Sequence, residues 1–328
     1  MAGVLTREGH DVVGLDTFYY DGCTLEDDGT DVPALRKDLR DVTREDLRGY
    51  DAVVHLAALC NDPLGDINPD WTYDINHHAS VRLAEEAKQA GVGRFLYASS
   101  CSMYGAAAGD DLLTEEAPLR PLTPYAVSKV RTEEDVTKLA DGSFSPVFMR
   151  NATVYGVSPR LRADVVLNNL TAWAYTTGKV RILSDGSPWR PIVHVEDVSY
   201  AFAAALAAPR DAIHNQAINI GSSNQNYQVR DLAGIVEQVV PNCAVEYAGG
   251  AQPDPRDYRV DFAKVTRLLP GWAPRWDARR GAEQLYDAYQ RTGLTTEDFQ
   301  GRRYVRLKQL RHLLDDHELD NNLRWTQR

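Results

Sequence analysis

The sequence is poor in cysteine, in long apolar runs and in basic charge, and each shortage excludes a class of protein. Its four cysteines, in 328 residues, form no CxxC pair, so neither a disulfide framework nor a cysteine zinc site is expected. No apolar run approaches the roughly 20 residues of a membrane span, and the start lacks a basic-then-apolar signal pattern. A net charge of −11 argues against nucleic acid as a partner. A reduced, soluble, cytoplasmic protein without membrane contact is therefore expected.

Short apolar strands alternate with amphipathic helices through the first half. "DAVVHLAAL", "RFLYASS" and "SPVFMRNATVYG" are typical of strands, and the segments 76–92 and 124–140 are typical of helices. This alternation predicts an α/β fold with a doubly wound, Rossmann-like parallel sheet. The looser pattern after it predicts a smaller α/β lobe. The final segment, with Leu307, Leu310 and Leu314 at helical spacing, predicts an amphipathic helix packed on the body.

"TPYAVSK" places Tyr125 and Lys129 four residues apart, on one face of the predicted helix. A phenol with an ordinary pKa near 10 is a poor base at neutral pH, and a nearby ammonium favours its phenolate. Upstream, "YASSCSMYG" ends a strand in hydroxyl residues, at the sheet edge where ligands of such folds bind. Ser100 is thus expected to share a substrate hydroxyl with Tyr125.

With these and further segments ("GHDVVGLD", "KDLRD", "VVHLAAL", "YDINHHAS", "ATVYG", "SDGSPWRPIVHVEDV", "NIGSSNQNYQVRDLA"), the chain resembles a known family from Gly9 to about Trp276. It resembles the extended short-chain dehydrogenase/reductases, specifically the NAD-dependent nucleotide-sugar epimerases and dehydratases. The resemblance implies NAD as cofactor, a nucleotide-diphosphate sugar as substrate and a homodimer. It implies an NAD-binding domain over 1–155 to which 191–222 returns, a nucleotide-sugar lobe over 156–190 and 223–295, and a helical tail over 296–328.

The resemblance also implies roles for individual residues. Ser100, Tyr125 and Lys129 would be catalytic, and Asp16 would favour NAD over NADP because an acid there repels a 2′-phosphate. Contacts to the cofactor are expected from Asp16, Asp38, Leu39, His55, Leu56, Ala57, Ala58, Asn76 and Lys129. Contacts to the substrate are expected from Thr153, Asn168, Arg190 and Arg256, with Asn168 alternatively a solvated helix residue. No metal site is expected: His77 and His78 are adjacent on a helix, and His194 is expected to be a core histidine.

Three departures from the family pattern limit these expectations. The sequence begins inside the helix that follows the family's first strand and GxxGxxG turn. A misassigned start is therefore expected, with Met1 an internal methionine. The alternative is a shortened chain that binds NAD poorly or not at all. Cys101 and Ser102 stand where related dehydratases carry an Asp and a Glu, which favours epimerisation. Ala251 replaces an arginine that often stands three residues before an acid, here Asp254.

The sequence therefore predicts an epimerase that acts by transient oxidation of the sugar at C4. The alternatives are a dehydratase using Cys101, a keto-sugar reductase, and a non-catalytic protein that binds a nucleotide sugar.

Overall fold

The computed structural model describes residues 1–26, 29–60, 67–106, 111–182, 184–247 and 256–326. The strands are β1 Gly14–Asp16, β2 Ala34–Arg36, β3 Ala52–His55, β4 Arg94–Ser100, β5 Ser145–Asn151, β6 Thr153–Tyr155, β7 Lys179–Ile182, β8 Trp189–His194, β9 Gln216–Ile220, β10 Asn226–Gln228 and β11 Ala244–Tyr247. The α-helices are α1 Ala2–Arg7, α2 Arg44–Leu47, α4 Pro69–Thr72, α5 Ala79–Ala90, α6 Pro124–Val136, α7 Val166–Thr177, α8 Val195–Ala207, α9 Arg210–Ile213, α10 Val229–Val239, α11 Ala263–Leu268, α12 Ala278–Thr292, α13 Thr296–Gln300 and α14 Arg306–Asp315. A π-helical turn, η2 Tyr73–His78, joins α4 to α5, and short 3-10 turns follow β4 (η3 Cys101–Tyr104) and precede α2 (η1 Leu39–Asp41).

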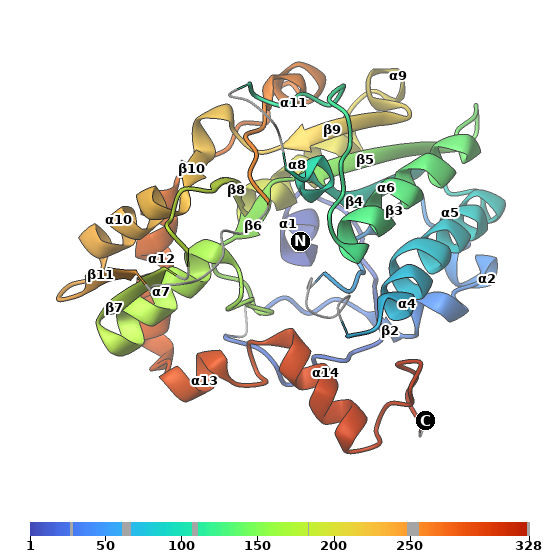
Figure 1. Cartoon of the computed structure of the whole chain (residues 1–328). Helices are drawn as coiled ribbons and strands as arrows, with labels where there is room; N and C mark the ends of the chain where they lie inside the picture. Colours follow the sequence, from blue (N-terminus) through green and yellow to red (C-terminus); the bar gives the residue numbers. More distant parts are fainter. Residues whose placement is uncertain (27–28, 61–66, 107–110, 183, 248–255, 327–328) are drawn as a thin grey trace.

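The main sheet is parallel, in the order β3-β4-β5-β9, and helices cover both of its faces (Figure 1). Alternate side chains of β4 point to opposite faces. Phe95 packs in one apolar cluster with Leu83 of α5, and Leu96 packs in another with Phe202 of α8. Each of these side chains contributes roughly 2 kcal/mol by its burial. The doubly wound α/β fold predicted from the sequence is confirmed.

Two smaller sheets build the second lobe, on the left of Figure 1. In one, β8 lies between β6 and β10, and in the other β7 pairs with β11. The sequence predicted one continuous strand over "SPVFMRNATVYG", and that prediction is wrong. Ala152 donates its N–H to the carbonyl of Ile220, and the chain then leaves the main sheet so that β6 pairs with β8.

The apolar segment "GHDVVGLD" forms only a short strand. β1 starts at Gly14, and Val13 before it is 39% exposed. Among the described strands β1 pairs with β2, and these two form a sheet of their own. By contrast, α5 lies within the helical segment predicted over 76–92; it ends at Ala90, and its C-cap Gly91 has a left-handed φ of 87°, which suits a residue without a side chain.

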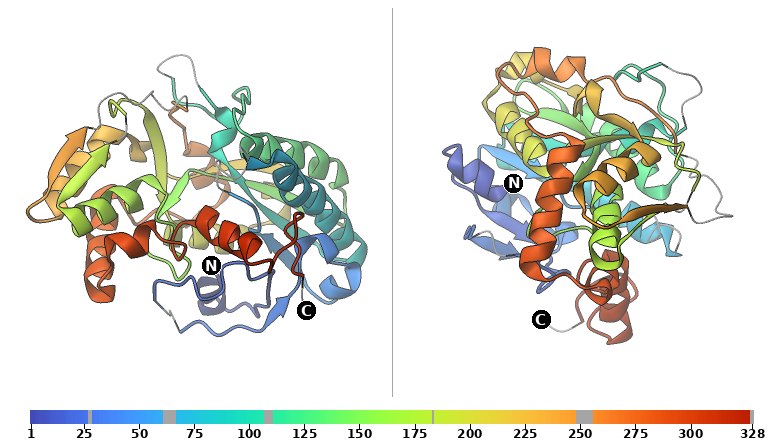
Figure 2. Two further views of the ribbon diagram at one scale, coloured as in Figure 1. Left: turned by 60° about the horizontal axis from the view of Figure 1, so that its bottom comes forward. Right: turned by 90° about the vertical axis from the view of Figure 1, so that its left-hand side faces the viewer.

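The tail predicted over 296–328 forms α13 and α14 and then folds back along the N-terminal segment, as the left view of Figure 2 shows. Leu310 and Leu313 of α14 are buried in a cluster that includes Tyr19 and Ile75. The predicted amphipathic helix is therefore present and lies on the body. In the described part of the chain, no helix has the length and apolar character needed to cross a membrane.

Candidate active site

Tyr125 and Lys129 lie at the start of α6, beside the end of β4. The hydroxyl of Thr123 caps this helix by accepting the N–H of Ala126, and Pro124 occupies its first turn. The Lys129 Nζ atom lies 5.6 Å from the centre of the Tyr125 ring and donates a 2.7 Å hydrogen bond to the Ala98 carbonyl. Since Ala98 is two residues before Ser100, this bond holds the helix against the strand end that carries the predicted serine.

The Lys129 side chain is only 2% exposed. Its burial lowers the ammonium pKa to about 8, against a smaller opposing effect of Cys60 and Glu133. Lys129 is therefore a cation that can release its proton close to neutral pH, which suits a group placed beside an acid–base tyrosine.

Ser100 caps the turn η3 with its side chain. Its Oγ accepts the Ser102 N–H at 3.1 Å and donates to the Ser102 Oγ at 2.9 Å. The next residue, Cys101, is 1% exposed, and its Sγ lies 3.2 Å from the Arg150 carbonyl oxygen. Burial raises the pKa of this thiol far above its ordinary value, so Cys101 is not available as a base. Cys101 is thus a packed core residue.

The ends of β1 and β2 place two carboxylates at the same edge of the molecule. Asp16 is exposed, and one of its oxygens accepts the Phe18 N–H at 2.6 Å. Asp38 forms ion pairs with Arg40 at 2.7 Å and Arg324 at 3.5 Å. Burial alone would raise the pKa of Asp38. The hydrogen bonds and charge of Arg40 and the charge of Arg324 outweigh burial and lower the pKa below its ordinary value, so the group is a carboxylate. Leu39, expected at the adenine, is 8% exposed and packs in the core.

The turn after β3 is expected to line the cofactor, but the His55 ring lies beneath it. Its Nε2 is 2.7 Å from Ser80 Oγ, and its burial lowers the imidazole pKa to about 3. Leu56 and Ala57 are exposed and Ala58 is partly buried, so these three residues present the surface of the turn.

Asn76 lies in the π-helical turn η2 and is fully buried. Its side-chain oxygen accepts the Leu59 N–H at 2.7 Å and its amide donates to the Leu59 carbonyl at 2.9 Å. Asn76 thus fixes the backbone of the turn after β3, and its expected contact to the cofactor stays a prediction. Irregular π turns of this kind are frequent at functional sites.

In the smaller lobe, Asn168 is not a solvated helix residue. It is 2% exposed, and its side chain accepts the Gly156 N–H and donates to the Arg162 carbonyl. That amide therefore shapes the loop between β6 and α7. A direct contact between Asn168 and a nucleotide stays a prediction.

The other predicted substrate contacts lie on and near β8. Arg190 donates to the carbonyls of Trp189 and Arg256, which brings the two predicted arginines together. Thr153, at the start of β6, is partly buried opposite Ile192. Ala251 and Asp254 lie outside the described residues.

Two arginines near Tyr125 and Lys129 were not predicted from the sequence. Arg162 and Arg306 donate to Cys60 Sγ, with Nη1 atoms 3.2 and 3.7 Å away. Burial raises the pKa of this thiol, but Arg162, Arg306 and Lys129 lower it by more. Tyr125 is also near enough to influence the pKa of Arg162. The "PRLRAD" motif was a signal for Arg162, whereas nothing in the sequence placed Arg306, from the tail, at this site.

The hydrogen-bonding groups at Asp16 and Lys129 fit the two riboses of NAD. At β1, Asp16 uses one oxygen for its described hydrogen bond, which leaves the other for ribose hydroxyls. At β4, the described hydrogen bond of the Lys129 ammonium goes to Ala98, and an ammonium has three donors. Among the described residues, no group of three or more His, Cys, Asp and Glu side chains could hold a metal ion.

Comparison with known proteins gives consistent matches. Residues 1–221 match the model of the NAD dependent epimerase/dehydratase family. A UDP-glucose 4-epimerase of Mycolicibacterium smegmatis is 28% identical, over 87% of this chain and 93% of its own. A UDP-glucuronate 4-epimerase of Thermodesulfobacterium geofontis is 26% identical, over 71% of this chain and 70% of its own.

Solved structures share the fold along most of the chain. MoeE5 in complex with UDP-glucuronic acid and NAD is 29% identical, with a TM-score of 0.75 over 88% of this chain and 93% of its own. TunA, an NAD dependent NDP-hexosamine 5,6-dehydratase, has a TM-score of 0.77 over the same shares, 88% and 93%. At 24% identity that second match shows the fold alone.

Proposed function

The chain belongs to the NAD dependent epimerase/dehydratase family, and we propose that it is a nucleotide-sugar epimerase that inverts C4 of the sugar through a transient 4-keto form. The observation that carries the proposal is the placement of Tyr125 and Lys129 against the end of β4, next to Ser100. The 4-epimerases among its relatives point to UDP-sugars as the first substrates to test.

Each catalytic residue has one task in this scheme. The Tyr125 phenolate oxygen takes the proton of the C4 hydroxyl, and Ser100 Oγ holds the same oxygen by a hydrogen bond. The Lys129 ammonium favours the phenolate by its charge and keeps donors for a ribose diol. Bound NAD would supply hydride acceptance from C4 and hydride return to it. After the keto sugar has turned in the site, so that its other face is reduced, Tyr125 gives the proton back to the C4 oxygen.

Dehydration needs a further acid and base near C5 and C6, and the matching positions do not supply them. Cys101 is buried with a raised pKa, and Ser102 is occupied with Ser100. These contacts favour the epimerase over a dehydratase of the same family.

The domain assignment follows the same scheme. We assign NAD to the main sheet, including β9 and α8, and the nucleotide-sugar to the lobe of α7, α10 and α12. Thr153, Asn168, Arg190 and Arg256 would then act on the nucleotide diphosphate, with Asn168 shaping the loop that carries Arg162.

The test is conversion of UDP-glucose and UDP-glucuronate to their C4 epimers by the full chain with NAD and no added NADH, followed by chromatography. We expect epimer formation that falls at least 100-fold in Tyr125→Phe. Tyr247→Phe, which changes a tyrosine that is 54% exposed, is the matched control and should keep wild-type turnover.

Other products would overturn the assignment. A 4-keto-6-deoxy sugar would show a dehydratase, and net consumption of added NADH would show a reductase. Sugar binding without any turnover would show a non-catalytic protein.

A further inference from the structure

The end of the chain forms a compact hairpin, residues 318–326, which we call the strap. Leu319 and Trp325 form an antiparallel bridge, and Asp320 Oδ1 accepts the N–H groups of Asn322 and Arg324, both at 2.8 Å. Leu323 is fully buried at its tip, with φ at 56°, a conformation a leucine adopts only when its surroundings hold it there. The strap is thus an ordered element rather than a frayed terminus.

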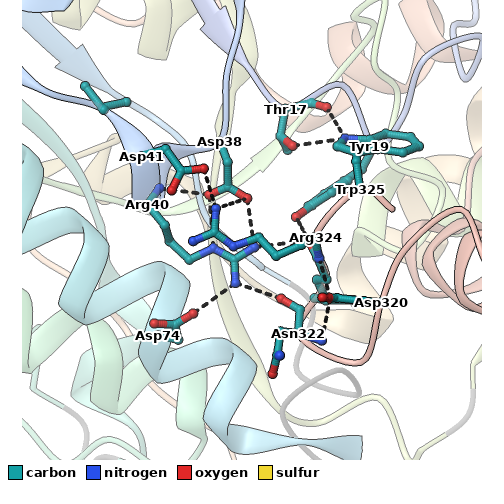
Figure 3. A network of polar contacts seen from close by, with 12 residues as sticks. Thr17, Tyr19, Asp38, Arg40, Asp41, Asp74, Asp320, Asn322, Arg324 and Trp325 are labelled. Atoms are coloured by element: carbon teal, nitrogen blue, oxygen red, sulfur yellow. Dashed lines mark hydrogen bonds and ion pairs between the residues drawn. The ribbon is translucent and has the colours of Figure 1, made fainter. Parts of the chain in front are cut away.

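The strap binds the segment that follows β1 (Figure 3). Trp325 Nε1 donates to the Thr17 carbonyl at 2.8 Å, and the Tyr19 hydroxyl donates to the Leu323 carbonyl. Leu319 and Leu323 share an apolar cluster with Tyr19. These contacts begin one residue after Asp16.

The strap also binds the segment that follows β2 (Figure 3). Arg40 donates to the carbonyls of Asn322 at 2.7 Å and Leu323 at 3.0 Å, while it holds Asp38 and, at 3.0 Å, Asp74. In return, Arg324 forms ion pairs with Asp38 and Asp41.

A third contact reaches the helical element before η2. Trp71 of α4 donates its indole N–H to the Asn321 carbonyl at 2.8 Å. The strap therefore contacts three segments that are separate in the sequence: the segments that follow β1 and β2, and α4.

We propose that the strap is a cofactor-retaining element, in which Arg324 and Trp325 are positioning residues that set how long the dinucleotide stays bound. Two of the three segments carry Asp16 and Asp38, the carboxylates assigned to the adenosine half of NAD. Asp16 is the last residue of β1 and Asp38 lies two residues after β2, so both are at the carboxyl ends of parallel strands, where such folds bind their ligands. The proposal rests on the NAD site of the proposed function, but not on the reaction at C4.

The physical reason is preorganisation. The β1–β2 pair is separate from the main sheet, so the segments after these strands depend on other contacts for their conformation. A segment that is already held in its binding conformation has less entropy to lose when a ligand binds. Arg324 acts through Asp38 and Asp41, and the charges involved are partly exposed, so added salt weakens their pairing.

The experiment compares Arg324→Ala, Arg324→Lys and Trp325→Phe with the wild-type full chain. NADH is bound to each protein, and its release into excess NAD is followed by stopped-flow fluorescence at low and high salt. The matched control is Arg311→Ala, which removes an exposed arginine from α14 of the same tail.

We expect NADH release to be at least tenfold faster in Arg324→Ala and measurably faster in Trp325→Phe. Arg324→Lys should recover part of the retention, and Arg311→Ala should match the wild type. Added salt should accelerate release from the wild type more than from Arg324→Ala.

Release at the wild-type rate from both Arg324→Ala and Trp325→Phe would overturn the proposal, as would an equal acceleration in Arg311→Ala. If Arg324→Ala fails to fold, Trp325→Phe and the salt dependence decide. A wild type that holds no NADH would overturn the retaining role together with the NAD site. A wild type that holds NADH but epimerises nothing would refute only the proposed reaction.

Discussion

The buried ammonium of Lys129 should make stability depend on pH in a direction that few lysines show. Its pKa falls from an ordinary 10.5 to about 8 in the folded protein, because burial penalises the charged form. Between these two values the unfolded chain binds more protons at this site than the folded one. Stability therefore rises with pH through this window, and the charge opposes folding at pH 7.

The size of the effect follows from the two pKa values. The difference corresponds to about 3 kcal/mol between neutral pH and pH above 10.5, of which about 2 kcal/mol appears between pH 7 and 9.5. That is a large fraction of the stability of an ordinary domain.

The assay is urea unfolding of the cofactor-free wild type and Lys129→Met at a series of pH values. Titrating groups that Lys129 does not influence cancel in the difference between the two proteins, so that difference reports Lys129 and its coupling to Cys60. We expect the wild type to gain about 2 kcal/mol relative to Lys129→Met from pH 7 to 9.5. Lys179→Met, which removes an ammonium from a side chain that is 57% exposed, is the matched control for the substitution itself. A flat or falling difference for Lys129→Met would refute the burial argument.

Three further predictions concern the residues around the site. Asn76→Ala leaves the buried N–H and carbonyl of Leu59 without their partner, so urea unfolding should show a loss of about 2–4 kcal/mol; a loss below about 1 kcal/mol would contradict this. Glu133→Gln leaves the Arg150 guanidinium buried without its 2.7 Å ion pair and should lower the free energy of unfolding by about 3–5 kcal/mol. An equal loss in Glu45→Gln, which breaks an exposed ion pair with Arg48, would argue against burial as the cause. Burial lowers the pKa of His194 to about 4, so stability should fall as pH falls from 6.5 towards 4. His194→Gln should make that fall smaller. Parallel acid-unfolding curves for the two proteins would show that burial does not keep the ring from protonation.

The sequence predicted best what depends on neighbours along the chain. The four-residue spacing of Tyr125 and Lys129 requires a common helix face, and the hydroxyl of Ser100 had to lie at a strand end. His194 was predicted as a core residue because its strand is apolar, and its ring indeed stacks on Trp276, with centroids 4.0 Å apart.

What the sequence did not predict depends on contacts between distant segments. The break between β5 and β6 is set by pairing with β9 and β8, which periodicity does not encode. Asn168 had the polarity of a solvated residue, and only its bonds to the loop before α7 explain its burial. The contact of Trp325 with Thr17 spans 308 positions, beyond the reach of any local pattern.

These two kinds of contact divide the site into halves that are held in different ways. At the Tyr125 end, one helix and one strand place the reacting groups, and hydrogen bonds from Lys129 to Ala98 and from Ser99 to Glu133 join them. At the Asp16 end, the conformation depends on a strap from the other end of the chain. A change in Tyr125 should therefore alter chemistry with little effect on cofactor release, and a change in Arg324 should do the reverse. The coupling energy between the two substitutions should be small, since additivity holds for sites that share no partner. A large coupling in the double variant Tyr125→Phe with Arg324→Ala, measured on NADH release, would show that the two halves form one cooperative unit.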